Sequence, residues 1–149
     1  EARTALAHAD TLAGICIATV GVTLPHGIGM AIGGMYPHIA HGEALALNYP
    51  AFTRFTYASA VDPFARLGRL LNPDLESVDD LAAAKRSCDE LDVFLQNIGL
   101  WMGLEEKRVP EEELRALAQQ CRVLPDYMNN PRIASEEEML QIIQDCFRR

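Results

Sequence analysis

Three of the four histidines in this chain lie in one apolar stretch, "LPHGIGMAIGGMYPHIAHGEA", residues 24–44. His26 and His41 are each followed directly by glycine, which leaves space for another group to approach the ring. Neutral imidazole is the most common metal ligand in proteins, and two histidines on successive helices could form half of a four-ligand site. The spacing leaves one alternative open, in which both rings are core histidines bonded to backbone carbonyl groups.

Two nearby side chains are candidates for a substrate pocket. Met30 follows His26 by one helical turn and is expected on the same face, either as core packing or as the floor of a pocket. His38 lies three residues before His41 in an expected turn, where it could be a third ligand or a solvent-facing residue. No carboxylate is spaced near these histidines, so a metal bound there would need further ligands from elsewhere.

Several function classes are excluded by what the chain lacks. No G-x-G-x-x-G or Walker pattern is present, so these residues bring no phosphate-binding loop. The net charge of −8 and the pI of about 4.9 make nucleic acid an unsuitable partner. No serine or cysteine has the setting of a nucleophile. The four cysteines are widely spaced without a CxxC pair, which favours reduced thiols in a cytoplasmic protein.

The segment between Asp10 and Glu43 contains no Asp, Glu, Lys or Arg over 32 consecutive residues. A membrane-spanning helix needs about 20 uninterrupted apolar residues, and Pro25 breaks this segment. We therefore expect no membrane partner but a buried helix pair at the beginning of the chain. Glu1 and Arg3 open directly into a helical pattern, so we expect no signal peptide and interpret the chain as a fragment of a larger protein.

Helical periodicity and capping signals recur along the rest of the chain, and no convincing strand alternation is present. Pro50 should end a short third helix, Ser77 should cap the next long one and Gly99 should stop it. Ser135 and Glu138 form an S-x-x-E capping box before the last helix. The fold class is therefore all-α. Helices are expected over residues 2–20, 26–35, 43–48, from Pro63 to "LNPD", 78–98, from Pro110 onward, and after Ser135.

The order of these landmarks resembles a known family. Ala13-Gly14, Gly21, His26, the Gly33-Gly34 pair, "HGEALALNYP" and the late "NNPRIASEEEMLQII" follow one another as in the carboxy-terminal helical domain of the iron-containing (group III) alcohol dehydrogenases. The resemblance extends from Ala2 to Phe147. It implies a helical bundle that corresponds to the C-terminal domain of a two-domain dehydrogenase, with residues 1–149 as one metal-binding domain and a nucleotide-binding domain upstream.

The resemblance also implies a site and a reaction. The family holds a divalent metal, Fe²⁺ or Zn²⁺, with an Asp and a His one turn apart and two later histidines, and the later two correspond to His26 and His41. The earlier pair, and the N-terminal domain that binds most of the NAD or NADP, would lie upstream of Glu1. The expected reaction oxidises alcohols or reduces aldehydes and ketones by hydride transfer. Met30 stands where many members carry a further histidine, which implies a different substrate pocket.

Two other functions are considered beside this one. Dehydroquinate synthase-like lyases and glycerol dehydrogenases share the implied architecture, and "HGEA" resembles the former. A helical interaction module without catalysis is the alternative outside enzymes. For the 149 residues alone we expect weak metal binding, no dehydrogenase activity, and dimerisation through an apolar face left uncovered.

Overall fold

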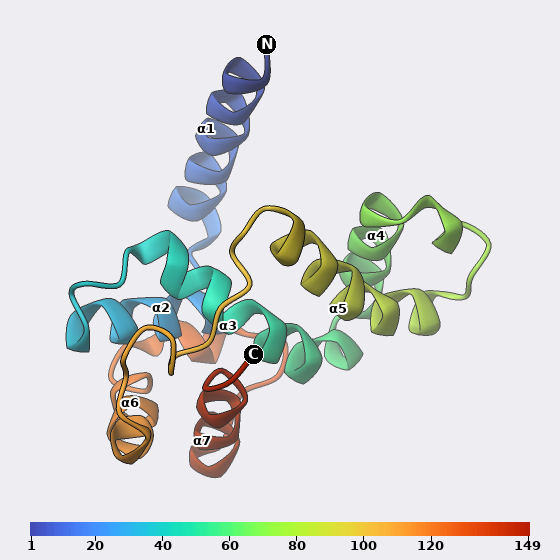
Figure 1. Ribbon diagram of the computed structural model, residues 1–149. Helices are drawn as coiled ribbons and strands as arrows, with labels where there is room; N and C mark the ends of the chain where they lie inside the picture. Colours follow the sequence, from blue (N-terminus) through green and yellow to red (C-terminus); the bar gives the residue numbers. More distant parts are fainter.

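The computed structural model describes all 149 residues, which form helices and no strand (Figure 1). The all-α prediction is therefore confirmed. The α-helices are α1 (Ala2–Val20), α2 (Leu24–Met35), α3 (His41–Thr56), α4 (Val61–Leu71), α5 (Asp80–Asn97), α6 (Leu114–Gln120) and α7 (Glu136–Asp145). The short 3₁₀ helices are η1 (Tyr57–Ser59), η2 (Pro73–Leu75), η3 (Glu111–Glu113) and η4 (Pro125–Asn129).

The main hydrophobic core lies between α2, α3, α6 and α7, and α3 contacts α2, α5 and α7. Burying an aliphatic side chain fully stabilises the fold by roughly 1.5–3 kcal/mol. The core therefore holds α2 and α3 firmly against one another, and these two helices carry the candidate histidines. Fully buried members are Ile28, Ile32, Leu47, Leu117 and Ile143.

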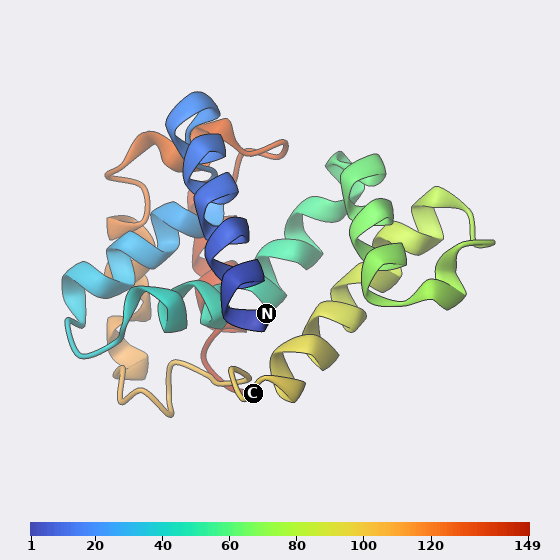
Figure 2. The same cartoon turned by 90° about the horizontal axis from the view of Figure 1, so that it is seen from above.

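A smaller second core joins α4 to α5, which form an arm beside the main core in both views (Figures 1 and 2). Gly68 makes this packing possible, because a Cβ atom there would lie 2.8 Å from the carbonyl oxygen of Ala83. Phe52 of α3 packs against both cores and links the arm to the main body.

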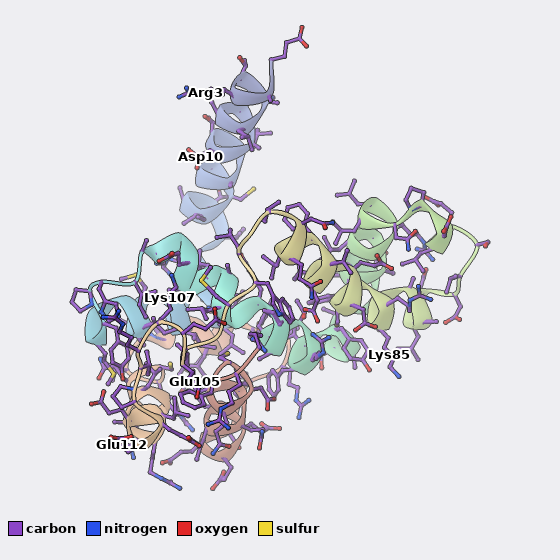
Figure 3. The ribbon with its side chains drawn as sticks, in the orientation of Figure 1. Arg3, Asp10, Lys85, Glu105, Lys107 and Glu112 are labelled. Atoms are coloured by element: carbon purple, nitrogen blue, oxygen red, sulfur yellow. The ribbon has the colours of Figure 1, made fainter.

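Helix α1 differs from the expected buried helix pair. Helix α2 is largely buried, but no residue of α1 is buried, and Val20 is 78% exposed. Figure 1 shows α1 projecting from the body, and Figure 3 shows Arg3 and Asp10 on this projecting helix. The prediction of a core helix pair is therefore wrong for α1, because no other element of these residues covers its aliphatic side chains.

The helices were compared with the length and apolar composition that a membrane-spanning helix needs. None of the helices is, by itself, both long and apolar enough to cross a bilayer. Helices α1 and α2 reach that length and composition only when taken together, and the chain bends by 101° between them.

Helix α3 is longer than expected, because it continues through Pro50 to Thr56. A proline inside a helix costs about 3 kcal/mol, since it removes one backbone hydrogen bond and crowds the preceding turn. Burial of Leu47, Ala51 and Thr53 on both sides of Pro50 outweighs that local cost. The prediction that Pro50 ends the helix was wrong because it weighed only the local signal.

The capping signals were correct in two of three places. Ser135 and Glu138 form the expected capping box of α7, and Gly99 has the positive φ of 74° typical of a residue after a helix. The cap of α5 is Asp79 rather than Ser77, and its carboxylate accepts from the backbone N–H of Ala82 at 3.0 Å. Both residue types cap helices well, so the local sequence did not distinguish them.

Candidate metal centre

Helices α2 and α3 bring the two candidate histidines into contact. His26 lies in the first turn of α2, and His41 is the first residue of α3. Their ring centroids are 5.1 Å apart, and the ring planes make an angle of 75°. Neither ring bonds a backbone carbonyl group, so the structure gives no support to the alternative of satisfied core histidines. His26 is partly buried and His41 is exposed.

Gly29 is the residue that allows this approach. A Cβ atom at position 29 would lie 3.0 Å from Cδ2 of Leu45 and 3.5 Å from Cε1 of His41. The His41 ring therefore lies against the backbone of α2, where a larger residue would separate the helices. Gly33 and Gly34 differ, because nothing lies within 4 Å of a Cβ atom at either position.

The donor set fits part of a divalent metal site. Imidazole nitrogens from two neighbouring rings suit iron and zinc, which proteins bind through histidine. The chain holds no group of three His, Cys, Asp or Glu side chains close enough for one ion. His26 and His41 therefore fit a metal as two of its ligands, with the others supplied from outside these residues.

Asn48 fixes the start of α2 on α3. Its buried side-chain amide donates to the carbonyl oxygens of Pro25 and Ala44, each at 2.9 Å. Pro25 directly precedes His26, so this contact sets where α2 begins relative to the helix that carries His41. The side-chain oxygen of Asn48 is buried without a partner.

The start of α3 is held by a second polar contact. Glu43 accepts a hydrogen bond from the backbone N–H of Ala40 at 3.2 Å and one from Nζ of Lys107 at 2.7 Å. The Lys107 bond, followed by the Ala40 bond, lowers the pKa of Glu43 below its usual value. Ala40 directly precedes His41, so these bonds fix the backbone that presents the ring.

His38 takes part in the turn rather than in a three-ligand group. Its Nε2–H donates to the carbonyl oxygen of Lys107 at 2.8 Å, and its ring lies edge-on to Tyr36. Tyr36 in turn donates a hydrogen bond from its hydroxyl group to Glu113 at 2.7 Å. Burial of the Tyr36 hydroxyl, followed by this hydrogen bond to a carboxylate, raises the pKa of Tyr36. The structure thus does not bring His38 together with His26 and His41 as a third ligand.

Met30 and an open hollow lie near His26. Met30 is 46% exposed, so its side chain is not part of the hydrophobic core formed by this chain. The hollow, of about 280 Å³, lies where α1, α2 and α3 meet and includes His26, Leu45 and Tyr49 in its lining. Burial raises the pKa of Tyr49, which keeps its hydroxyl protonated. The hollow on this side of His26 is therefore lined mainly by apolar groups, together with Tyr49.

One carboxylate beside the site was missed by sequence reasoning. Asp126 of η4 places Oδ2 at 3.4 Å from Nδ1 of His26. The two residues are 100 positions apart, and no local pattern around Asp126 distinguishes it from other acidic residues. Only the packing of η4 on α2 brings them together. The expectation that no carboxylate lies near the histidines is therefore wrong.

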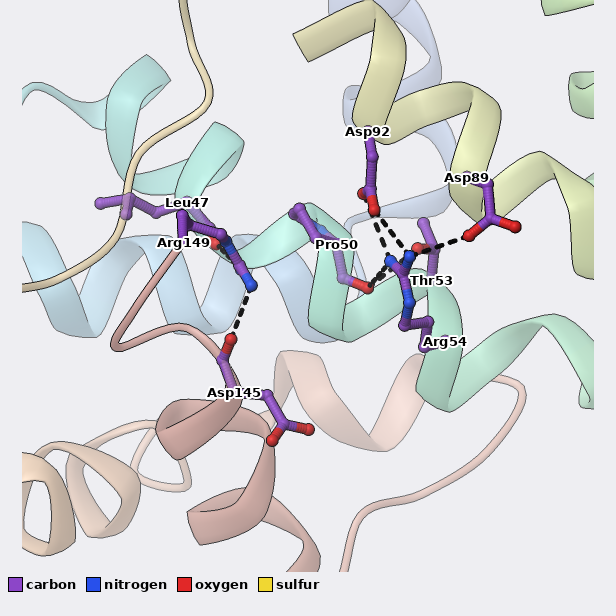
Figure 4. A network of polar contacts seen from close by, with 8 residues as sticks. All are labelled: Leu47, Pro50, Thr53, Arg54, Asp89, Asp92, Asp145 and Arg149. Carbon is purple, nitrogen blue, oxygen red and sulfur yellow. Dashed lines mark hydrogen bonds and ion pairs between the residues drawn. The ribbon is translucent and has the colours of Figure 1, made fainter. Parts of the chain in front are cut away.

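A second acidic and basic network lies away from the histidines, between α3 and α5 (Figure 4). Arg54 donates to both carboxylate oxygens of Asp92, at 3.2 and 2.6 Å, to Asp89 at 3.0 Å, and to the carbonyl of Pro50. Asp92, the strongest of these partners, raises the pKa of Arg54. Both carboxylate oxygens of Asp92 are paired with Arg54, which indicates a structural contact between the two helices.

Comparison with known proteins agrees with the all-α fold. The model of the Fe-containing alcohol dehydrogenase family, C-terminal, matches residues 1–147. The chain is 31% identical over 146 residues to the NAD-dependent methanol dehydrogenase of Bacillus methanolicus, covering 98% of this chain and 38% of that protein. It is 24% identical over 147 residues to the 1,3-propanediol dehydrogenase of Klebsiella pneumoniae, and this match covers 99% of this chain and 38% of that protein. The chain thus spans well under half the length of these relatives.

Solved structures share the fold. A crystal structure of 1,3-propanediol oxidoreductase superposes with a TM-score of 0.84 at 24% identity, over 91% of this chain and 35% of the other. An archaeal halo-thermophilic alcohol dehydrogenase from a Red Sea brine pool, bound to NZQ, superposes with a TM-score of 0.78 at 27% identity, over 93% of this chain and 36% of the other. In each case the match is to about a third of a longer chain.

Proposed function

Because this chain belongs to the Fe-containing alcohol dehydrogenase family, we propose that it supplies two metal ligands, His26 and His41, to a longer alcohol dehydrogenase. The observation that carries the proposal is the contact between their rings, with centroids 5.1 Å apart, made by two helices that share one core. We propose residues 1–149 as the helical domain of that enzyme, since they span 38% of the length of the first two relatives.

Two features of the chain support a larger enzyme. The two histidines make only half of a four-ligand site, so the remaining ligands must come from outside these residues. Helix α1 exposes aliphatic side chains along its length, and a helix of this kind is normally covered by another element. The cofactor, NAD or NADP, would be bound mainly by the part of the protein that precedes α1.

The chemistry follows from the kinds of groups involved. When bound, the metal would act as a Lewis acid on the substrate oxygen while the nicotinamide cofactor accepts or donates the hydride. His26 and His41 would bind through neutral ring nitrogens, and Asn48 and Glu43 would hold their helices in place. The apolar side chains beside His26, such as Leu45, would exclude water from the reacting atoms. The substrate class is a small alcohol or the corresponding carbonyl compound.

The test replaces each histidine in the full-length protein. We expect His26→Ala and His41→Ala each to lose bound iron or zinc, measured by elemental analysis, and to lose alcohol oxidation together with it. His8→Ala, an exposed histidine on α1, serves as the matched control and should keep both properties. Normal metal content in either variant at position 26 or 41 would show that the ligand assignment is wrong.

The same preparations separate this function from its alternatives. Wild-type protein should reduce NAD or NADP with at least one member of a panel of simple alcohols. Activity only on the dehydroquinate synthase substrate would support the lyase alternative instead. Absence of both activities in a metal-loaded full-length protein would favour an interaction module. Homodimer formation stays a prediction, which light scattering of the full-length protein tests.

A further inference from the structure

We infer that Asp126 is a positioning residue for the metal site, which sets the proton of His26 on Nδ1 and leaves Nε2 free to bind the ion. This inference rests on the proposed function, since it assumes that His26 is a ligand. No feature of the sequence or of the family match assigns a role to Asp126.

The first argument is the chemistry of the contact. Oδ2 of Asp126 lies 3.4 Å from Nδ1 of His26, and the side chains are 21% and 30% exposed respectively. An ionised carboxylate has no proton to donate, so the hydrogen bond forms only when Nδ1 carries the proton. In the neutral ring Nε2 then holds the lone pair that a metal requires. Because the two nitrogens lie on different edges of the ring, Nε2 is directed away from η4.

The second argument is that η4 is built to hold Asp126 against α2. A Cβ atom at Gly27 would lie 3.3 Å from Cβ of Asp126, so glycine at this position gives the aspartate its space. Asn129, the last residue of η4, donates its side-chain amide to the carbonyl oxygen of Val22, just before α2, at 3.1 Å. Its neighbour Asn130 donates to Oγ1 of buried Thr56 at 3.0 Å. The segment is therefore tied to both helices of the site.

The third argument is the lack of any other partner for this carboxylate. Asp126 pairs with no lysine or arginine, whereas Asp62, Asp80, Asp89 and Asp92 all pair with arginine. His26 is its single ionic or hydrogen-bonding partner among the side chains. A partly buried acid without a cation is costly unless a donor faces it, and the Nδ1–H of His26 is that donor.

The experiment measures Co²⁺ binding by the full-length, metal-stripped protein, in competition with a chelator. We expect Asp126→Ala to weaken Co²⁺ affinity by about 10- to 100-fold, the usual effect of removing a hydrogen-bond partner of a metal-binding histidine. Asp126→Asn keeps the side-chain shape but adds an amide donor, so it no longer enforces the Nδ1–H form and should also weaken binding. Asp62→Asn, which alters an exposed pair with Arg66, is the matched control and should bind as wild type.

Two further readouts separate positioning from a merely structural role. The melting temperature of the metal-free protein should be the same for wild type and Asp126→Asn. In ¹⁵N-histidine NMR spectra of the metal-free protein, His26 should carry its proton on Nδ1 in wild type and shift toward the Nε2–H form in Asp126→Ala. The visible spectrum of bound Co²⁺ should keep the same shape, because Asp126 is not itself a ligand.

The outcomes are distinguishable from failure of the proposed function. Unchanged Co²⁺ affinity in both Asp126 variants overturns the inference, as does a loss of affinity that only parallels a lower melting temperature. A changed Co²⁺ spectrum would make Asp126 a direct ligand and also overturns it. Normal Co²⁺ binding by His26→Ala would instead refute the ligand assignment on which the inference rests.

Discussion

His41, the first residue of α3, places its ring edge-on to the ring of His26, with 5.1 Å between the centroids. The two residues are 15 positions apart, and the chain between them makes most of α2 and a five-residue turn. The ring contact depends on how closely α3 crosses α2. Substitutions at Gly29 and Asn48 therefore test that crossing without altering the histidines themselves.

Gly29 controls the approach of His41 to α2. Gly29→Ala would place Cβ 3.0 Å from Leu45, whose flexible side chain can shift, so we expect a small change in metal affinity. The branched side chain of Gly29→Val would reach the His41 ring itself and should weaken metal binding much more. Chelator competition in the full-length protein measures both variants. Gly34→Ala, where a Cβ atom meets nothing, is the control, and a Gly29→Val variant with normal affinity would contradict the prediction.

Asn48 should be needed for stability as well as for the site. Asn48→Ala removes two buried hydrogen bonds, and we expect the free energy of unfolding to fall by about 1–3 kcal/mol. Asn48→Asp should be worse, because a carboxylate cannot donate to the carbonyls of Pro25 and Ala44. Urea unfolding of the full-length protein measures the difference. Exposed Asn97→Ala should change stability by less than about 0.5 kcal/mol.

Arg54 should stabilise the contact between α3 and α5. Arg54→Ala leaves the partly buried carboxylate of Asp92, 15% exposed, without its cation. We expect a loss of about 1–2 kcal/mol, at the lower end for such a contact because Arg54 itself is 46% exposed. The control is Arg66→Ala, which breaks an exposed pair and should cost no more than about 0.5 kcal/mol. Equal melting temperatures for the two variants would contradict this.

Cys121 and Cys146 should resist thiol reagents in the folded protein. Burial raises the pKa of each thiol to about 12, and the thiolate is the reactive form. At neutral pH we expect no alkylation by iodoacetamide at either position until denaturant unfolds the chain. An unfolded thiol ionises near pH 8.5, whereas these buried thiols stay protonated to about pH 12. The free energy of unfolding should therefore fall as the pH rises from about 8.5 toward about 12, because the unfolded chain releases these protons first. Mass spectrometry of labelled peptides, and alkaline unfolding curves, measure the two effects.

Much of the fold could be predicted from the sequence because its signals are local. The capping box of Ser135 and Glu138 and the stop at Gly99 depend on residues within a turn of one another, and both formed as predicted. The order of glycines, histidines and "NNPR" was sufficient to indicate the family, which the match over residues 1–147 confirmed. His26 and His41 were chosen from the same local pattern, and their role stays a prediction.

The predictions that were wrong concern features that depend on tertiary packing. Pro50 lies within α3 because buried neighbours outweigh its local cost, and α1 is exposed because nothing among these residues covers it. Asp126 reaches His26 across 100 positions only because η4 packs on α2.

The sequence by itself determined the all-α class, the capping box of Ser135 and Glu138, the stop at Gly99 and the family, since those signals lie in residue types at short, fixed spacings. The tertiary structure alone decided which carboxylate faces His26, how closely His41 approaches α2, and which helix stays uncovered. These depend on how distant segments fit together in space, and the free energy of that fit is spread over many side chains, so no short motif records it.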